Sequence, residues 1–67
     1  MFKNLVRERR QQLALSQTKL ACMLGIAGST LSDLELGKRQ AWPKIRKALS
    51  RVLGVTEREL FPEGWKL

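Results

Sequence analysis

A three-residue turn, Gly25-Ile26-Ala27, separates two short segments whose apolar residues recur every three or four positions, and it limits the folds open to this chain. Ser16 is a good N-cap for the first segment, residues 17–24, and the glycine that follows favours the left-handed conformation that ends a helix. Gly37 ends the second segment, about residues 28–36. A three- to four-residue turn containing glycine brings two helices together at roughly a right angle. The sequence therefore predicts a helix-turn-helix pair.

Three further helices complete the predicted fold. The first covers about residues 2–13, with apolar residues on one face and Arg9 unexpectedly in the middle of it; the apolar residues are Phe2, Leu5, Val6 and Leu13. Pro43 opens a helix that runs to Leu53 and is ended by Gly54. Thr56 and Glu59 form a capping box for a short last helix. We expect a compact all-α domain of five helices spanning residues 1–67.

Several functional classes are disfavoured by composition. A single cysteine, Cys22, excludes an internal disulfide, and with no histidine in the chain neither a metal site nor a catalytic nucleophile–base pair is expected. The longest apolar run, residues 20–27, is far shorter than the ~20 residues that span a bilayer, and no signal-peptide pattern opens the sequence. We therefore expect a cytoplasmic protein that is not an enzyme and needs no cofactor.

The charge favours an anionic partner. Thirteen Lys and Arg face six Asp and Glu, which gives a net charge of +7, and residues 38–51 hold six cations and no acid. Charge alone leaves DNA, RNA, an acidic protein and an anionic membrane open. The apolar face of residues 43–53 would by itself suit a membrane surface, but within this domain we expect it to be core.

The outward side of the second segment can be placed on a helical wheel. Leu31 and Leu34 define its inward direction, and Glu35 lies at the edge of the buried side, which indicates a structural role. Four small or acidic residues lie opposite: Gly28, Ser29, Ser32 and Asp33. In DNA-binding helix-turn-helix proteins the second helix enters the major groove and its early residues meet base edges. These four residues are the predicted base-reading face.

The chain resembles the lambda-repressor/Cro-type (Xre-type) helix-turn-helix regulators from about Leu5 to Phe61. The resemblance lies in the residues Ser16-Gln17, Leu20-Ala21, Leu24-Gly25-Ile26, Leu31, Leu34-Glu35, Gly37-Lys38-Arg39, Leu49, Leu53-Gly54-Val55 and Glu59-Leu60-Phe61. It implies double-stranded DNA as partner and base contacts from the four residues above. It also implies an ion pair between Arg10 and Glu35. The phosphate contacts that it implies come from Gln17, Lys38, Arg39 and Lys44. We add Thr30 to the residues expected to contact phosphates.

Four residues depart from the family pattern. Ala14 stands where a left-handed glycine is usual, which costs ~1 kcal/mol if that geometry is kept. Ala27 replaces the usual Ser or Thr cap of the reading helix, a loss of ~1 kcal/mol. Gly28 lacks the side chain that often reads the first base, and Arg46 occupies a position that is usually apolar.

The expected function is a repressor that occludes a palindromic operator as a homodimer, with half-sites ~34 Å apart. The outward residues of the helix over 17–24, Thr18, Lys19 and Cys22, include no acid, which favours a repressor over an activator. A bacterial or phage-encoded protein on the nucleoid is expected, with no small-molecule ligand. The alternative is a protein-interaction module, an antitoxin-like or anti-repressor partner. In the tail, residues 61–67, Phe61, Trp65 and Leu67 could either cap the core or form a two-fold dimer contact.

Overall fold

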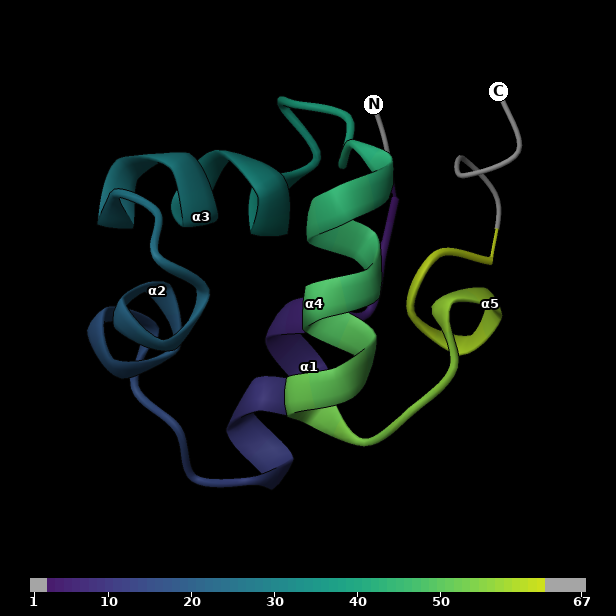
Figure 1. Ribbon diagram of the computed structural model, residues 1–67, viewed down its shortest axis with the longest axis horizontal. Coiled ribbons are helices and arrows are strands. Elements are labelled where there is room, and N and C mark those ends of the chain that lie inside the picture. Colours follow the sequence, from purple (N-terminus) through teal and green to yellow (C-terminus); the bar gives the residue numbers. More distant parts are fainter. Residues whose placement is uncertain (1–2, 63–67) are drawn as a thin grey trace.

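A computed structural model of the chain describes residues 3–62, and these form five helices (Figure 1). The helices are α1 (Val6–Gln12), α2 (Gln17–Leu24), α3 (Gly28–Leu36), α4 (Pro43–Leu53) and α5 (Glu57–Leu60). In Figure 1, α4 stands between the α2–α3 pair on one side and α5 on the other, and α3 lies across the top of α2. The all-α, five-helix fold predicted from the sequence is confirmed.

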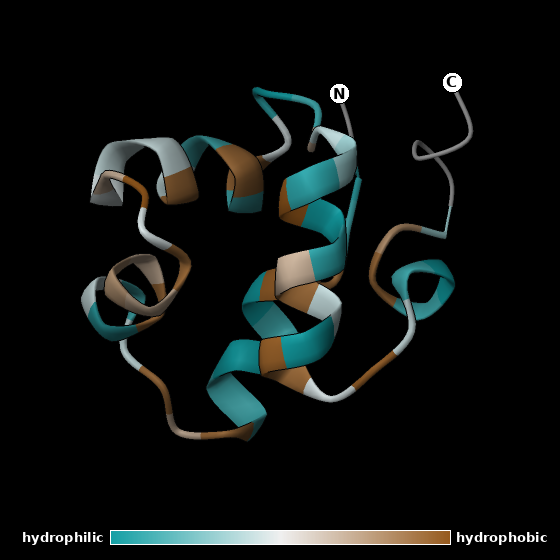
Figure 2. Cartoon of the chain, viewed as in Figure 1, coloured by the Kyte–Doolittle hydropathy of each residue, from teal (hydrophilic) through white to brown (hydrophobic). Residues whose placement is uncertain are grey.

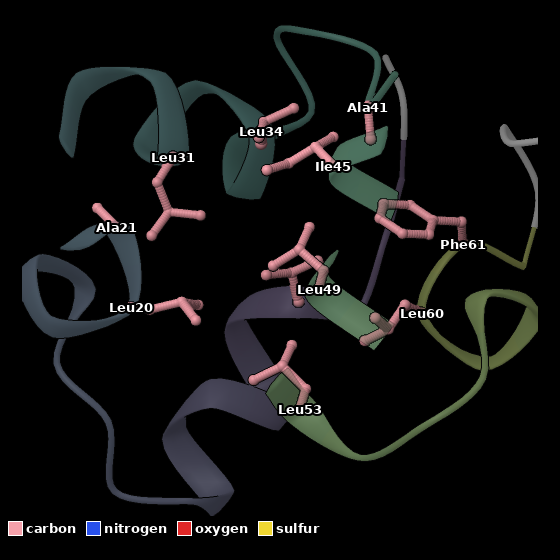
Figure 3. Close-up of a cluster of buried hydrophobic side chains, with 11 residues drawn as sticks. Leu20, Ala21, Leu31, Leu34, Ala41, Ile45, Leu49, Leu53, Leu60 and Phe61 are labelled. Atoms are coloured by element: carbon pink, nitrogen blue, oxygen red, sulfur yellow. The ribbon is translucent and has the colours of Figure 1, made fainter. Parts of the chain in front are cut away.

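The core is built from apolar side chains that all five helices, or the residues next to them, contribute. The buried residues in the described part of the chain are Val6, Leu20, Ala21, Leu31, Leu34, Ala41, Ile45, Leu49, Leu53, Leu60 and Phe61. Figure 3 shows Leu34 of α3 and Ile45 of α4 pointing toward each other between their helices. Fully burying a leucine contributes ~1.5–3 kcal/mol, so this cluster is the main source of stability. Phe61 is thus part of the core, while Trp65 and Leu67 lie outside the described residues.

The amphipathic helix α4 supplies the centre of this core. Figure 2 shows hydrophobic and hydrophilic bands alternating along it. Ile45, Leu49 and Leu53 are buried, and Trp42 and Val52 pack against the cluster. The apolar face of α4 is therefore core, as predicted, rather than a membrane-binding surface. Within residues 3–62 no helix is long and apolar enough to cross a membrane.

Local signals set the ends of α2 to α5 where the sequence predicts them. The Ser16 Oγ accepts a hydrogen bond from the Lys19 N–H at 3.0 Å, which caps α2. Gly25 and Gly54 end α2 and α4 in the left-handed region, with φ of 72° and 71°. The capping box of α5 is complete: the Thr56 side chain accepts from the Glu59 N–H, and the Glu59 carboxylate accepts from the Thr56 N–H. Pro43 is the first residue of α4.

The prediction for α1 is wrong at its start. The helix begins at Val6, whose N–H donates to the Asn4 Oδ1 at 3.1 Å, and residues 4 and 5 also bond to distant parts of the chain. The Asn4 Nδ2 donates to the Leu34 carbonyl at 2.7 Å, and the Leu5 N–H donates to the Leu60 carbonyl at 2.8 Å. The predicted apolar face is also wrong: Val6 is buried, but Leu5 and Leu13 are 46% and 41% exposed. Phe2, also predicted on this face, lies outside the described residues.

Two arginines at unexpected positions join separate helices. The Arg9 Nε donates to the carbonyl of Leu53 at 3.2 Å, one of the last carbonyls of α4, which have no partner within the helix. The Arg46 Nη1 donates to the Ala41 carbonyl at 2.8 Å, and its Nε lies 3.4 Å from the Glu57 carboxylate. Arg9 therefore ties α1 to the end of α4, and Arg46 ties the start of α4 to α5.

Candidate nucleic-acid interface

Helix α3 presents a polar side away from the core. Leu31 and Leu34 are 0% and 1% exposed, so they fix which side of the helix faces inward. Of the four residues assigned to base reading, Gly28 and Ser29 are exposed, and Ser32 and Asp33 are half-buried. The side chains of Ser29, Ser32 and Asp33 form no hydrogen bond or ion pair within residues 3–62. Their hydrogen-bonding groups are therefore available to a ligand.

A buried ion pair fixes α3 against α1 and α2. The Arg10 Nε lies 2.7 Å from Oε2 of Glu35, its Nη2 donates to Oε1 at 3.3 Å, and its Nη1 donates to the Leu15 carbonyl at 2.8 Å. The side chains of Arg10 and Glu35 are only 12% and 2% exposed. Such a fork-shaped contact is directional as well as strong, so it sets the orientation of the helix as well as its position.

Gln17, the first residue of α2, joins this network. Its Nε2 donates to Oε1 of Glu35 at 3.0 Å, so the Glu35 carboxylate accepts from residues of both α1 and α2. A side-chain amide nitrogen carries two hydrogens. One of them bonds to Glu35 and so braces α3, and the other remains for an external acceptor.

The cations assigned to phosphate contact lie just beyond the end of α3. Lys38 and Arg39 are exposed in the loop before α4, and Lys44 is exposed in the first turn of α4. The guanidinium carbon of Arg39 lies 5.2 Å from the centre of the Trp42 ring, within the range of a cation–π contact. At an exposed site such a contact contributes about 0.5–1 kcal/mol, so it favours this position of the Arg39 side chain. The sequence analysis does not predict this contact; the signal for it is an aromatic residue three positions after a cation.

The first turn of α3 is uncapped and uncrowded. Ala27 has the backbone conformation of an N-cap, with φ −68° and ψ 148°, but no side chain caps the helix. A Cβ added at Gly28 would meet no atom within 4 Å. Thr30 is half-buried at the flank of this turn. The start of α3 therefore offers free backbone N–H groups and open space.

Metal chemistry has no support in this region. Among the residues that the structure describes, no group of three or more His, Cys, Asp or Glu could hold a metal ion. Cys22 is an exposed free thiol on α2.

Comparison with protein families gives a match that spans all five helices. A family model described as "Helix-turn-helix" matches residues 6–60, from the first residue of α1 to the last residue of α5. No curated protein sequence matches the chain significantly.

Proposed function

Because the chain belongs to the helix-turn-helix family of the Xre or lambda-repressor type, a family of DNA-binding regulators, we propose that it is a transcriptional repressor that occludes an operator as a homodimer. The observation that carries this proposal is the unpaired polar side of α3 flanked by the exposed cations Lys38, Arg39 and Lys44. We infer that the protein acts on the nucleoid in the bacterial cytoplasm, as a bacterial or phage-encoded regulator.

Base reading is assigned to α3 lying in the major groove. The Asp33 carboxylate can accept a hydrogen bond from a cytosine N4 amine, and the hydroxyls of Ser29 and Ser32 can bond to either donor or acceptor edges. A bidentate contact contributes ~1–3 kcal/mol of discrimination, whereas these contacts are single. Direct readout is therefore modest, and DNA shape supplies part of the preference.

Contacts to the phosphates of the DNA backbone are assigned to five residues on or near α3: Gln17, Thr30, Lys38, Arg39 and Lys44. Each cation that neutralises a phosphate steepens the fall of affinity with salt, by about 0.9 in the slope of log K against log salt. The Arg10–Glu35–Gln17 network supports this role because it presents the free Gln17 N–H and α3 in one fixed arrangement.

A homodimer follows from the modest contacts of one subunit. A two-fold pair would place two copies of α3 in successive major grooves, ~34 Å apart, and so double the number of base contacts. The operator is then expected to be a palindrome.

The first test is selection of bound duplexes from a randomised pool, followed by titration of the winner between about 50 and 200 mM salt. We expect an enriched palindrome and a steep salt slope. The double variant Lys38→Ala, Arg39→Ala should weaken all duplexes together and lower the slope by about 1 for each cation removed in each subunit. Asp33→Ala should instead change which duplex is preferred.

Two outcomes would contradict the proposal. Absence of DNA binding at the lowest salt would exclude a DNA-binding repressor and favour the protein-interaction module. If Asp33→Ala changed neither affinity nor preference, the outward side of α3 would not be the reading face.

A further inference from the structure

A hollow of about 240 Å³ opens beside the outward side of α3, where α1, α2 and α3 meet. Its lining residues are Arg7, Arg10, Gln17, Ser32, Glu35 and Leu36. Gln17 and Ser32 already have roles in the proposed DNA contact, and Arg10 and Glu35 brace the helices. Arg7 has no role in either.

The charge of the hollow is that of Arg7. Glu35 neutralises Arg10 at 2.7 Å, and both side chains are nearly buried. Arg7 is exposed and forms no hydrogen bond or ion pair within residues 3–62. The other two arginines of α1 are engaged, Arg9 with the Leu53 carbonyl and Arg10 with Glu35. A single uncompensated cation therefore faces a hollow that Ser32 shares with the reading side of α3.

We propose that Arg7 is a further DNA-backbone contact and that the hollow holds one backbone phosphate. This inference rests on the proposed function. The guanidinium fork matches the oxygen geometry of a phosphate, and the free Nε2 hydrogen of Gln17 is a second donor on the same hollow. The three cations assigned above all follow the C-terminal end of α3 in the chain, whereas Arg7 comes from α1. On this proposal α1 contacts the DNA backbone in addition to the cations that follow α3.

The lining favours a nucleic-acid backbone over a free phosphate ion. Leu36 is 47% exposed and forms an apolar wall. A deoxyribose beside the phosphate would cover this wall, whereas a free ion would leave it in water.

The experiment compares Arg7→Ala with the matched control Arg58→Ala. Arg58 is an exposed arginine of α5 without an ion pair in the described part of the chain, so its removal changes the net charge by the same amount. With the selected duplex, we expect Arg7→Ala to lower the salt slope by about 1 per subunit and to weaken all duplexes equally. Arg58→Ala should leave the slope unchanged. Arg7→Lys should keep most of the slope, because the charge stays, but bind more weakly because the fork is lost.

Ethylation interference locates the contact. At one phosphate per half-site, ethylation should weaken binding of the wild-type protein and of Arg58→Ala strongly, and binding of Arg7→Ala less, because only the Gln17 donor remains there. Circular-dichroism melting curves check that Arg7→Ala, a substitution of an exposed and unpaired side chain, remains folded.

The outcomes separate this inference from the proposed function. If the wild type binds DNA with the expected Lys38 and Arg39 dependence but Arg7→Ala behaves as Arg58→Ala does, the inference is overturned and the proposed function stands. If ethylation of every phosphate weakened binding to the same extent, Arg7 would act through a diffuse electrostatic field rather than through a contact with one phosphate. That result would also overturn the inference. Displacement of DNA by inorganic phosphate at matched ionic strength, dependent on Arg7, would indicate a site for free phosphate instead. If the wild type does not bind DNA, both fail.

Discussion

Ala14 is the clearest case of a residue whose backbone favours another side chain. Its φ is +57°, and it is the one residue other than glycine with positive φ between residues 3 and 62. It lies in the turn between α1 and α2, so the left-handed geometry that the family pattern requires is kept without the glycine that suits it. A Cβ in this region is strained by roughly 1–2 kcal/mol.

Replacing this residue should therefore stabilise the fold. We expect Ala14→Gly to raise the free energy of unfolding by about 1 kcal/mol, since relief of strain exceeds the added entropy of the unfolded chain. Urea denaturation followed by circular dichroism measures this change. Ala48→Gly, in the middle of α4, is the control and should lower the free energy of unfolding by about 0.5–1 kcal/mol. Equal destabilisation by both substitutions would show that Ala14 is unstrained.

At the scale of elements, one carboxylate joins three helices. Glu35 of α3 accepts from Arg10 of α1 and Gln17 of α2, and its side chain is 2% exposed. Removing one member of a buried pair leaves the other charge without a partner in a poorly solvated place, which is more harmful than removing both.

A double-mutant cycle tests this coupling. We expect Arg10→Leu to lower the free energy of unfolding by about 3 kcal/mol, because it leaves the Glu35 charge buried and uncompensated. Adding Glu35→Leu should restore part of the loss, so the two effects should be strongly non-additive. Urea denaturation in the Ala14→Gly background keeps the variants within the measurable range. Additive effects would mean that the pair contributes little to the joining of α1 and α3.

The sequence predicts the elements whose boundaries depend on local chemistry. The Ser16 cap, Pro43 and the Thr56–Glu59 box act on residues within one turn, so the starts of α2, α4 and α5 can be placed from the sequence. The start of α1 cannot, because it depends on bonds from Asn4 to the Leu34 carbonyl and from Leu5 to Leu60. Backbone carbonyls occur at every residue, so the sequence does not show which one will accept.

The same distinction holds at the candidate site. The outward side of α3 could be predicted because Leu31 and Leu34 define its direction by spacing alone. The bracing of Glu35 by Arg10 was implied by resemblance rather than by spacing. The hollow beside Arg7 and the contact between Arg39 and Trp42 require elements to meet in space, and no periodicity encodes that.

For the whole molecule, the excess of positive charge has opposite effects on folding and on binding. A net charge of +7 on 67 residues repels itself in the compact state, and salt screens this repulsion over about 8–10 Å at physiological concentrations. The same salt weakens attraction to phosphates.

We therefore expect salt to shift the two properties in opposite directions. Between about 50 and 200 mM salt, the melting temperature of the free protein should rise, while DNA affinity falls by about 10³-fold or more if six or more phosphates are contacted. Circular-dichroism melts and anisotropy titrations on one preparation give both quantities. A melting temperature that falls with salt would show that the attractive ion pairs, Arg10–Glu35 and Arg46–Glu57, outweigh the repulsion.

The empty space at Gly28 has a consequence for how such a protein can change. A Cβ added there would meet no atom within 4 Å, and the inward side of α3 is fixed by Leu31, Leu34 and Glu35 rather than by this residue. Recognition and folding are therefore separable at this position. On the proposed function, a single codon change could give the protein a new target without a stabilising partner mutation, which makes position 28 the natural starting point for a mutational library.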